Sequence, residues 1–299
     1  MRPLPLLLSL CAAPALAEAP RVVTDIAPVH ALVAAVMADV GTPTLLLPPG
    51  GSAHGHQLRP SEAADLAAAD LLFWIGPELT PWLEAAAPTL SGNSVSVPLI
   101  DLQGTHLREL AEEDEEEHHT GDGHDHDGVD PHAWLDPQNA LIWLPEIARQ
   151  LADADPQNAA RYRANANAMM EDVTRAADTA ADRLSGITGG FIVYHDAYGY
   201  FTDRFGLPQA ASIADSDAVQ SGARHLAELQ GMAKEQDIRC LFTEPQFDGA
   251  VAQKLAASLG LQVGVLDPLG AGLEPGAALY PALITGMADA LAGCMAADR

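Results

Sequence analysis

Histidine is the residue type in this sequence with the clearest chemical pattern. His54 and His56 lie in the glycine-rich turn PPGGSAHGHQLRP, His132 lies in DPHAWLDP, and His195 lies in YHDAYGYF at the end of an apolar run. Ligand sites in α/β proteins form at the carboxyl ends of strands. Three separate histidine-bearing turns at such places can converge on one point, which predicts a metal site.

A site with three imidazoles suits zinc. Zn²⁺ prefers about four ligands in a tetrahedron and favours imidazole nitrogen. Asp267 ends the strand-like run LQVGVLD and is placed to supply a carboxylate as the fourth ligand. A harder ion such as Mn²⁺ would favour more oxygen donors. We therefore predict that Zn²⁺ is bound by His54, His132, His195 and Asp267.

The residues alone leave other interpretations of these groups open. His56 could be the ligand in place of His54, and a histidine at the end of a strand is often only a hydrogen-bonding group. His132 could pack against Trp134 in a core. Asp267 precedes a proline and could belong to a simple turn.

A second group of histidines lies in an acidic segment. Residues 112–130 read EEDEEEHHTGDGHDHDGVD and contain almost no apolar residue, so they cannot support a core and are predicted to form a mobile loop. Its histidines are His118, His119, His124 and His126. This composition favours an auxiliary site that captures zinc weakly. The alternative is a solvated spacer whose histidines bind metal only incidentally.

The elements that would position these turns alternate between strands and helices. Strand-like runs occur at 21–26, 44–47, 71–75, 95–99, 191–194, 210–213, 238–243 and 261–266, and helical patterns occur at 28–40, 61–69, 222–236, 248–260 and from 278. This alternation predicts an α/β fold with two Rossmann-like lobes. Each lobe would hold a roughly four-stranded, mainly parallel sheet flanked by helices.

One long, rigid helix is predicted to join the lobes. Asp155 and Pro156 provide an N-cap and a proline at the first helical position, and apolar residues then recur at steps of three and four. About 30 residues at about 1.5 Å each span roughly 45 Å. The predicted boundaries are 18–155 for the N-terminal lobe with the acidic loop, 156–186 for the linking helix, and 187–299 for the C-terminal lobe.

Charge and the N-terminal segment restrict the partners and the location of the protein. A net charge of −26 argues against nucleic acid and anionic membranes, because both require a basic surface. Met1 and Arg2 precede an apolar run that ends in Ala15-Leu16-Ala17, the pattern of a signal peptide cleaved after Ala17. That run is too short to span a bilayer, so we expect an exported chain without direct membrane insertion. We also expect a monomer.

Three cysteines occur, and one of them lies in the signal segment. Cys11 would be the lipidated residue of a lipoprotein, but Leu10 precedes it where a small residue is usual. Cys240 and Cys294 remain after cleavage. In an oxidising compartment an isolated pair indicates one disulfide, and two buried free thiols are the alternative.

Five segments occur in a recognisable order over almost the whole mature chain: GGSAHGHQLRPSE, DPHAWLDP, YHDAYGYF, FTEPQF and VLDPLG. Together they resemble the ZnuA-type solute-binding proteins of bacterial zinc ABC transporters. A histidine-rich acidic insert directly before DPHAWLDP is also typical of that family. The resemblance implies a two-lobed fold with metal in the cleft, and a periplasmic protein that captures Zn²⁺ and delivers it to a membrane permease.

The resemblance also carries over to single residues. It implies that His54, His132 and His195 are metal ligands, and manganese-binding relatives usually carry Glu at the third of these positions, which favours zinc here. Asp267 matches the fourth position, which is variable in zinc members and can be replaced by water or another carboxylate.

Zinc members of the family often link the start of a strand to the final helix by a disulfide, which implies a bond between Cys240 and Cys294. Other functions consistent with the motifs are manganese or iron binding, a periplasmic zinc chaperone or adhesin, and a zinc hydrolase. A hydrolase needs an open coordination position and a general base, for which Glu244 is the candidate, but the favoured interpretation of Glu244 is a group that supports the site or the fold. Since there is no H-E-x-x-H motif, we predict a binding protein and not an enzyme.

Overall fold

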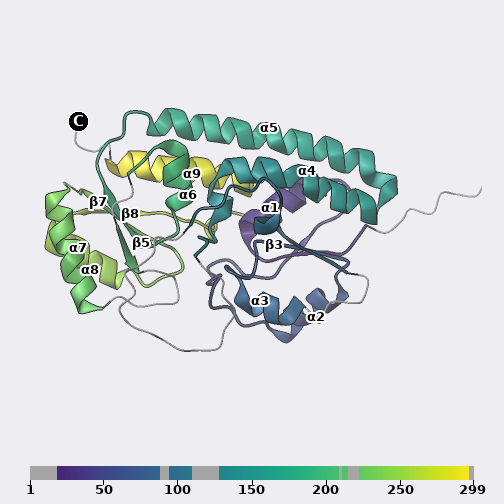
Figure 1. The fold of residues 1–299 in the computed structure, drawn as a ribbon, viewed down its shortest axis with the longest axis horizontal. Coiled ribbons are helices and arrows are strands. Elements are labelled where there is room, and N and C mark those ends of the chain that lie inside the picture. The colour runs from purple at the N-terminus through teal and green to yellow at the C-terminus, as the bar shows by residue number, and fades with distance from the viewer. Residues whose placement is uncertain are drawn as a thin grey trace, which may run out of the picture.

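Two parallel sheets form the framework of the protein. The computed structural model describes residues 19–87, 94–109, 128–208, 211–214, 222–236 and 238–295. Its strands form two four-stranded parallel sheets, in the orders β2-β1-β3-β4 and β6-β5-β7-β8. Figure 1 shows the sheets on opposite sides of the molecule, with helix α5 running over both. The predicted α/β architecture is confirmed.

The first sheet consists of β1 (Val22–Thr24), β2 (Thr44–Leu45), β3 (Leu71–Trp74) and β4 (Val95–Pro98). Every residue of β1 and β3 is buried, because helices cover both faces of the sheet. Successive side chains of a strand point to opposite faces. Leu71 and Phe73 therefore join a large core with α1 (Ala27–Val36), while Leu72 and Trp74 join a smaller one with α2 (Pro60–Ala68) and α3 (Pro81–Ala86).

The second sheet consists of β5 (Phe191–His195), β6 (Ala211–Ala214), β7 (Cys240–Thr243) and β8 (Gln262–Val265). On one face, Ile192 and Leu241 pack with α7 (Ala223–Glu235) and α8 (Ala250–Leu259). On the other face, Val193 and Phe242 belong to the same large core as the first sheet. A disulfide joins Cys240 to Cys294 in α9 (Leu279–Met295), with the Cα atoms 6.2 Å apart, as expected from the sequence.

The large core is continuous between the two sheets. It contains Val22 and Phe73 of the first sheet, Phe191 and Phe242 of the second, and residues of α1, α4 (Pro137–Ala154), α5 (Ala159–Leu184) and α9. Helix α5 packs along α4 and α9 (Figure 1). One buried apolar body therefore joins the two halves, which argues against a loose hinge between them.

Helix α5 begins at Ala159, after a 3₁₀ turn at Pro156–Asn158. The predicted cap residue Asp155 is buried, and its carboxylate accepts hydrogen bonds from the side chains of Asn158 and Tyr162, at 2.7 and 3.0 Å. The helix has 26 residues, which corresponds to about 39 Å. It is therefore somewhat shorter than the sequence predicts.

Helix α4 and the shorter helices α3 and α6 (Gly199–Phe205) are additional to those predicted from the sequence. Helix α4 contains Pro145, a residue that normally argues against a helix interior because it lacks a backbone N–H. The helix starts with Asp136 as N-cap, whose side chain accepts from the backbone N–H of Gln138. Its buried face, which includes Trp143 and Ile147, compensates for the proline by packing into the large core.

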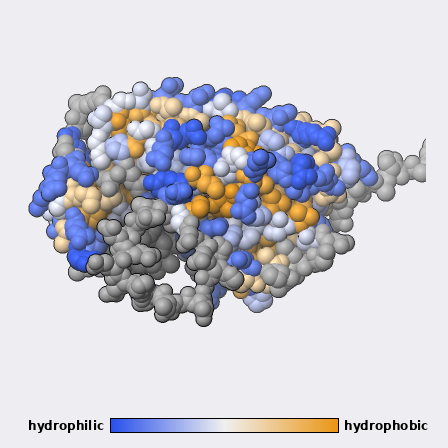
Figure 2. Space-filling model, viewed as in Figure 1, coloured by the Kyte–Doolittle hydropathy of each residue, from blue (hydrophilic) through white to orange (hydrophobic). Residues whose placement is uncertain are grey.

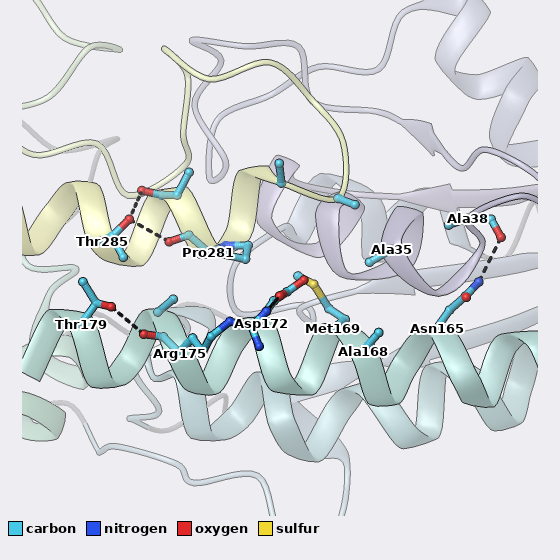
Figure 3. A pocket seen from close by; sticks show the side chains of 14 residues that line it. Ala35, Ala38, Asn165, Ala168, Met169, Asp172, Arg175, Thr179, Pro281 and Thr285 are labelled. Carbon is cyan, nitrogen blue, oxygen red and sulfur yellow. Dashed lines mark hydrogen bonds and ion pairs between the residues drawn. The ribbon is translucent and has the colours of Figure 1, made fainter.

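A groove of about 810 Å³ lies between α1, α5 and α9 and is lined mostly by small side chains (Figure 3). None of the fourteen residues that line it is a histidine, so it is separate from the candidate metal ligands. Over the described ranges, no helix combines the length and the apolar character needed to cross a membrane.

Candidate metal centre

His132 is a buried imidazole held by a buried carboxylate. It directly precedes the 3₁₀ turn Ala133–Leu135. Asp130 Oδ1 accepts from the His132 backbone N–H at 3.0 Å and from its Nδ1 at 2.7 Å. Because an ionised carboxylate only accepts, the hydrogen of the neutral ring is on Nδ1 and the Nε2 lone pair is directed away from Asp130. This is the arrangement of a metal-binding histidine.

His195 repeats this arrangement in the second sheet. It is the last residue of β5, and its Nδ1 donates to Glu244 Oε1 at 2.6 Å. The Glu244 side chain is fully buried, and its other oxygen accepts from Gln246 Nε2 at 2.6 Å. Tyr198 also lies against this carboxylate. Burial, together with the charge of Glu244, raises the pKa of Tyr198 well above its usual value, so its hydroxyl stays protonated.

The Nε2 atoms of these two histidines face each other. His132 Nε2 and His195 Nε2 are 3.4 Å apart, and the ring centres are 5.3 Å apart. For a zinc–nitrogen bond of about 2.0–2.1 Å and tetrahedral angles, two coordinating nitrogens lie roughly 3.4 Å apart. The pair therefore has the spacing of one edge of a zinc tetrahedron, with one ligand from each half of the molecule.

His54 is the third imidazole at this point. Its ring centre lies 5.5 Å from that of His132, in an edge-on orientation. The indole nitrogen of Trp82 donates to the carbonyl of Ala53 at 2.6 Å and so fixes the turn that carries His54. His56, the alternative ligand, instead has Nε2 2.8 Å from a carboxylate oxygen of Glu62. The structure thus directs His54, and not His56, to the site.

A small cavity of about 10 Å³ lies among these rings, which is room for roughly one water-sized sphere. It is lined by Ala53, His54, Leu79, His132, Trp134, His195, Gln246, Pro268 and Leu269. Across the described residues, no group of three or more His, Cys, Asp or Glu side chains is already closed at metal-coordinating spacing. The site is thus a preformed pair with a third imidazole beside it.

Asp267 lies in the loop that borders the cavity but is not one of the residues that line it. Its Oδ1 accepts from the backbone N–H groups of Leu269 and Gly270, at 3.2 and 2.8 Å, and its Oδ2 accepts from Gly272 at 3.1 Å. The carboxylate therefore holds its own loop in shape.

Trp134 connects this loop to the first half of the chain. Its indole nitrogen donates to the carbonyl of Pro268 at 2.7 Å, and its own carbonyl accepts from the Tyr280 hydroxyl at 2.7 Å. All three residues are buried, and Trp134 and Pro268 both line the cavity. These bonds set the distance between the loops that carry His132 and Asp267.

A family model described as the periplasmic component A of the zinc-uptake complex, ZnuA, matches residues 22–294. The chain belongs to the ZnuA family. The high-affinity zinc uptake system protein ZnuA of Paracoccus denitrificans is 43% identical, covering 97% of this chain and 96% of that protein. The protein of the same name from Brucella abortus (strain 2308) is 34% identical, covering 95% of this chain and 94% of that protein. A zinc-bound crystal structure of a ZnuA deletion mutant superposes with a TM-score of 0.78 at 25% identity, covering 94% of this chain and 100% of that one.

Membership of the ZnuA family confirms several predictions made from the sequence. The chain is a transport binding protein and not an enzyme, and it belongs to the periplasm. The histidines predicted as ligands, His54, His132 and His195, gather around one cavity. The predicted auxiliary histidines and the signal peptide lie outside the described residues.

The supporting groups of this ZnuA-family site were harder to predict. The sequence favours a supporting or structural role for Glu244 over that of a general base, and Glu244 does accept a hydrogen bond from the candidate ligand His195. Asp130 stands two positions before His132, and that spacing was an available signal for its role. Trp82 acts on the turn of His54 from 29 positions along the chain, and no local pattern announces such a contact.

Proposed function

We propose that this protein captures Zn²⁺ in the periplasm with His54, His132 and His195 and delivers it to the membrane permease of an ABC transporter. The observation that carries the proposal is the pair of carboxylate-backed imidazoles whose Nε2 atoms are 3.4 Å apart. Neutral imidazoles with fixed tautomers are strong zinc donors and need no rearrangement. The relatives named as high-affinity zinc uptake proteins support the same cargo.

The fourth ligand in this proposal is Asp267. An ionised carboxylate has about four lone-pair positions, and three of those of Asp267 accept backbone N–H groups. One position is left for a metal, so Asp267 can bind Zn²⁺ without giving up its loop. Water is the alternative fourth ligand, since a zinc ion with three histidines readily keeps one.

Other parts of the chain serve this function in supporting roles. We propose that residues 18–155 and 187–299 act as two lobes joined by the helix of 156–186, and that the protein works as a monomer. The auxiliary histidines, His118, His119, His124 and His126, would capture zinc weakly and pass it to the main site. The disulfide Cys240–Cys294 fastens the last helix to the second sheet.

Cargo selection follows from the donor set. Manganese and iron(II) are harder ions that favour oxygen donors, whereas three imidazoles favour zinc. Affinity is expected to fall in acid, because protons compete for the same nitrogens. A zinc chaperone without a transporter would use the same site, and transport of ⁶⁵Zn by cells that carry the permease distinguishes the two.

The test is crystallography of the mature chain with zinc, using anomalous scattering at the zinc edge. We expect one tight metal ion on all three histidines. Finding fewer than two of them on the metal would overturn the proposal. In solution, competition titration against a chelator of known affinity should show Zn²⁺ bound far more tightly than Mn²⁺. His132→Ala and His195→Ala should abolish tight binding, whereas His225→Ala, whose ring bonds the Ser212 carbonyl, should not.

A further inference from the structure

Residues 108–109, before the acidic histidine segment, pair with residues 129–130, which come after it. Glu109 and Val129 form an antiparallel bridge. The backbone N–H of Asp130 donates to the carbonyl of Arg108 at 2.8 Å, which extends the pairing by one step. Asp130, one of the paired residues, also accepts a hydrogen bond from the imidazole of His132, so the pairing is in direct contact with a candidate zinc ligand.

Arg108 connects these paired residues to α6 in the second half of the molecule. Its guanidinium contacts Asp130 Oδ2 at 3.3 Å and Asp203 Oδ2 of α6 at 3.1 Å. Its backbone N–H donates to the Tyr200 hydroxyl at 2.8 Å, which in turn donates to the Asp130 carbonyl at 2.8 Å. The guanidinium also lies so close to Gly199 that a Cβ there would collide with it. Arg108 thus sits in a fitted position on α6.

A second ion pair joins the same two parts of the molecule, with the arginine on α6 and the carboxylate in the first half. Arg204 of α6 donates two hydrogen bonds to Asp136, at 2.6 and 2.7 Å. Asp136 is buried and caps α4, so this pair joins α6 to the element that follows His132. Helix α6 comes shortly after His195 in the chain, and Figure 2 shows hydrophilic side chains gathered over it.

We infer that Arg108 and α6 form a clasp that positions His132 relative to His195. The inference rests on the proposed function, because these two histidines are the proposed zinc ligands. The clasp acts through Asp130: Arg108 fixes one carboxylate oxygen, and the other oxygen fixes the ring of His132. Since the other end of the clasp is α6, which follows His195 in the chain, the clasp sets the gap between proposed ligands from the two halves of the molecule. Arg108, Tyr200, Asp203 and Arg204 are positioning residues that do not touch the metal.

The expected loss of zinc affinity on removing Arg108 depends on how many contacts separate Arg108 from the metal. Loss of a group bonded directly to a ligand histidine typically weakens metal affinity about 10- to 100-fold. Arg108 is one contact further away, and when it is removed Asp130 can still bond to His132, although the carboxylate is held less firmly. We therefore expect Arg108→Gln to weaken Zn²⁺ binding about 5- to 20-fold, chiefly through faster release.

The experiment compares Arg108→Gln with Arg149→Gln in the full mature chain. Arg149 forms exposed ion pairs with Glu146 and Asp153 on α4. The control therefore removes the same charge from ion pairs within a single helix. Zn²⁺ affinity comes from chelator competition and the release rate from stopped-flow mixing with excess chelator. We expect the loss in Arg108→Gln only. Arg108→Lys should recover part of it, and Asp203→Asn should show a smaller loss of about twofold.

A metal-free measurement separates this inference from the proposed function. In the metal-free protein, the Nδ1–H proton of His132 should give a protected NMR resonance, because it is held by Asp130. Arg108→Gln should broaden or remove that signal, whereas Arg149→Gln should leave it unchanged. An unchanged resonance in Arg108→Gln, or equal zinc affinities in the two variants, would overturn the clasp. Failure of the wild-type protein to bind zinc would overturn the proposed function but would leave the resonance as a test of the clasp.

Discussion

Glu244→Gln is the sharpest single test of how the metal centre is built. In the wild-type protein this buried carboxylate accepts from His195 Nδ1 at 2.6 Å and from Gln246 Nε2 at 2.6 Å. The amide has the same shape, so its carbonyl oxygen can still accept from His195. Its NH₂ group would then face that of Gln246. Among the described residues, no donor reaches Gln246 Oε1, so Gln246 can turn over and accept the new hydrogen bond.

The substitution should therefore separate affinity from stability. The packing and the hydrogen bonds to His195 and Gln246 can be kept, and a charge is removed from a fully buried position, so the thermal midpoint of the metal-free protein should change little. The proposed ligand His195 loses its charged partner, which makes its ring a weaker donor to the metal. A loss of about 10- to 100-fold in zinc affinity is expected, or roughly 1.4–2.8 kcal/mol.

The assay is chelator competition at constant pH, with a thermal melt of the metal-free protein beside it. Glu146→Gln is the matched control, because Glu146 pairs with Arg149 on the surface of α4 and has no contact with the site. Zinc affinity of Glu244→Gln within twofold of wild type would refute the reasoning. A large drop in the thermal midpoint would show instead that Glu244 serves the fold more than the metal.

Three further predictions concern the loop, the first turn and the first sheet. Deleting 112–127 should leave one tight zinc site and remove weaker binding in calorimetry; loss of the tight site would contradict the division of roles. Trp82→Phe removes the N–H that holds the Ala53 carbonyl and should weaken zinc binding several-fold, whereas Trp74→Phe, which loses a bond to a serine, should not. Burial raises the pKa of Asp25 to about 7 despite two backbone N–H donors. The folded state therefore holds a proton that the unfolded state releases near pH 4, so this group makes stability fall as the pH rises from about 4 to about 7. Asp25→Asn should flatten that part of the urea-unfolding profile, and an unchanged profile would show that Asp25 does not titrate there.

The strands could be predicted from the sequence because their signal is local. Runs such as LLFW at 71–74 and FIVY at 191–194 are apolar throughout, as strands covered on both faces must be. Helix α4 could not be predicted because it contains Pro145, which disfavours a helix interior. Only tertiary packing offsets the cost of this proline. The start of α5 shifted because Asp155 bonds to side chains and not to the helix backbone.

In the site, too, the features that could be predicted are those with a local signal. The positions of His132 and His195 are fixed by a turn and a strand end that can be read locally, so their convergence was predictable. The residues alone do not decide between His54 and His56, because the choice depends on which ring Glu62 and Trp82 contact, and the family resemblance supplies the preference for His54. Whether Asp267 binds metal also depends on backbone N–H groups that its own loop turns toward it, which spacing does not reveal.

Helix α9 comes after every other described element in the sequence, and it completes the interior of both halves by packing against α1, α5 and β8. A polypeptide that enters the periplasm with its amino terminus first delivers this helix after the elements against which it packs. Until it arrives, the apolar side chains of α1 and α5 that it will cover stay open to water. Export therefore brings all the proposed zinc-binding turns into the periplasm before the large core can close, and the core can form fully only once α9 has been exported.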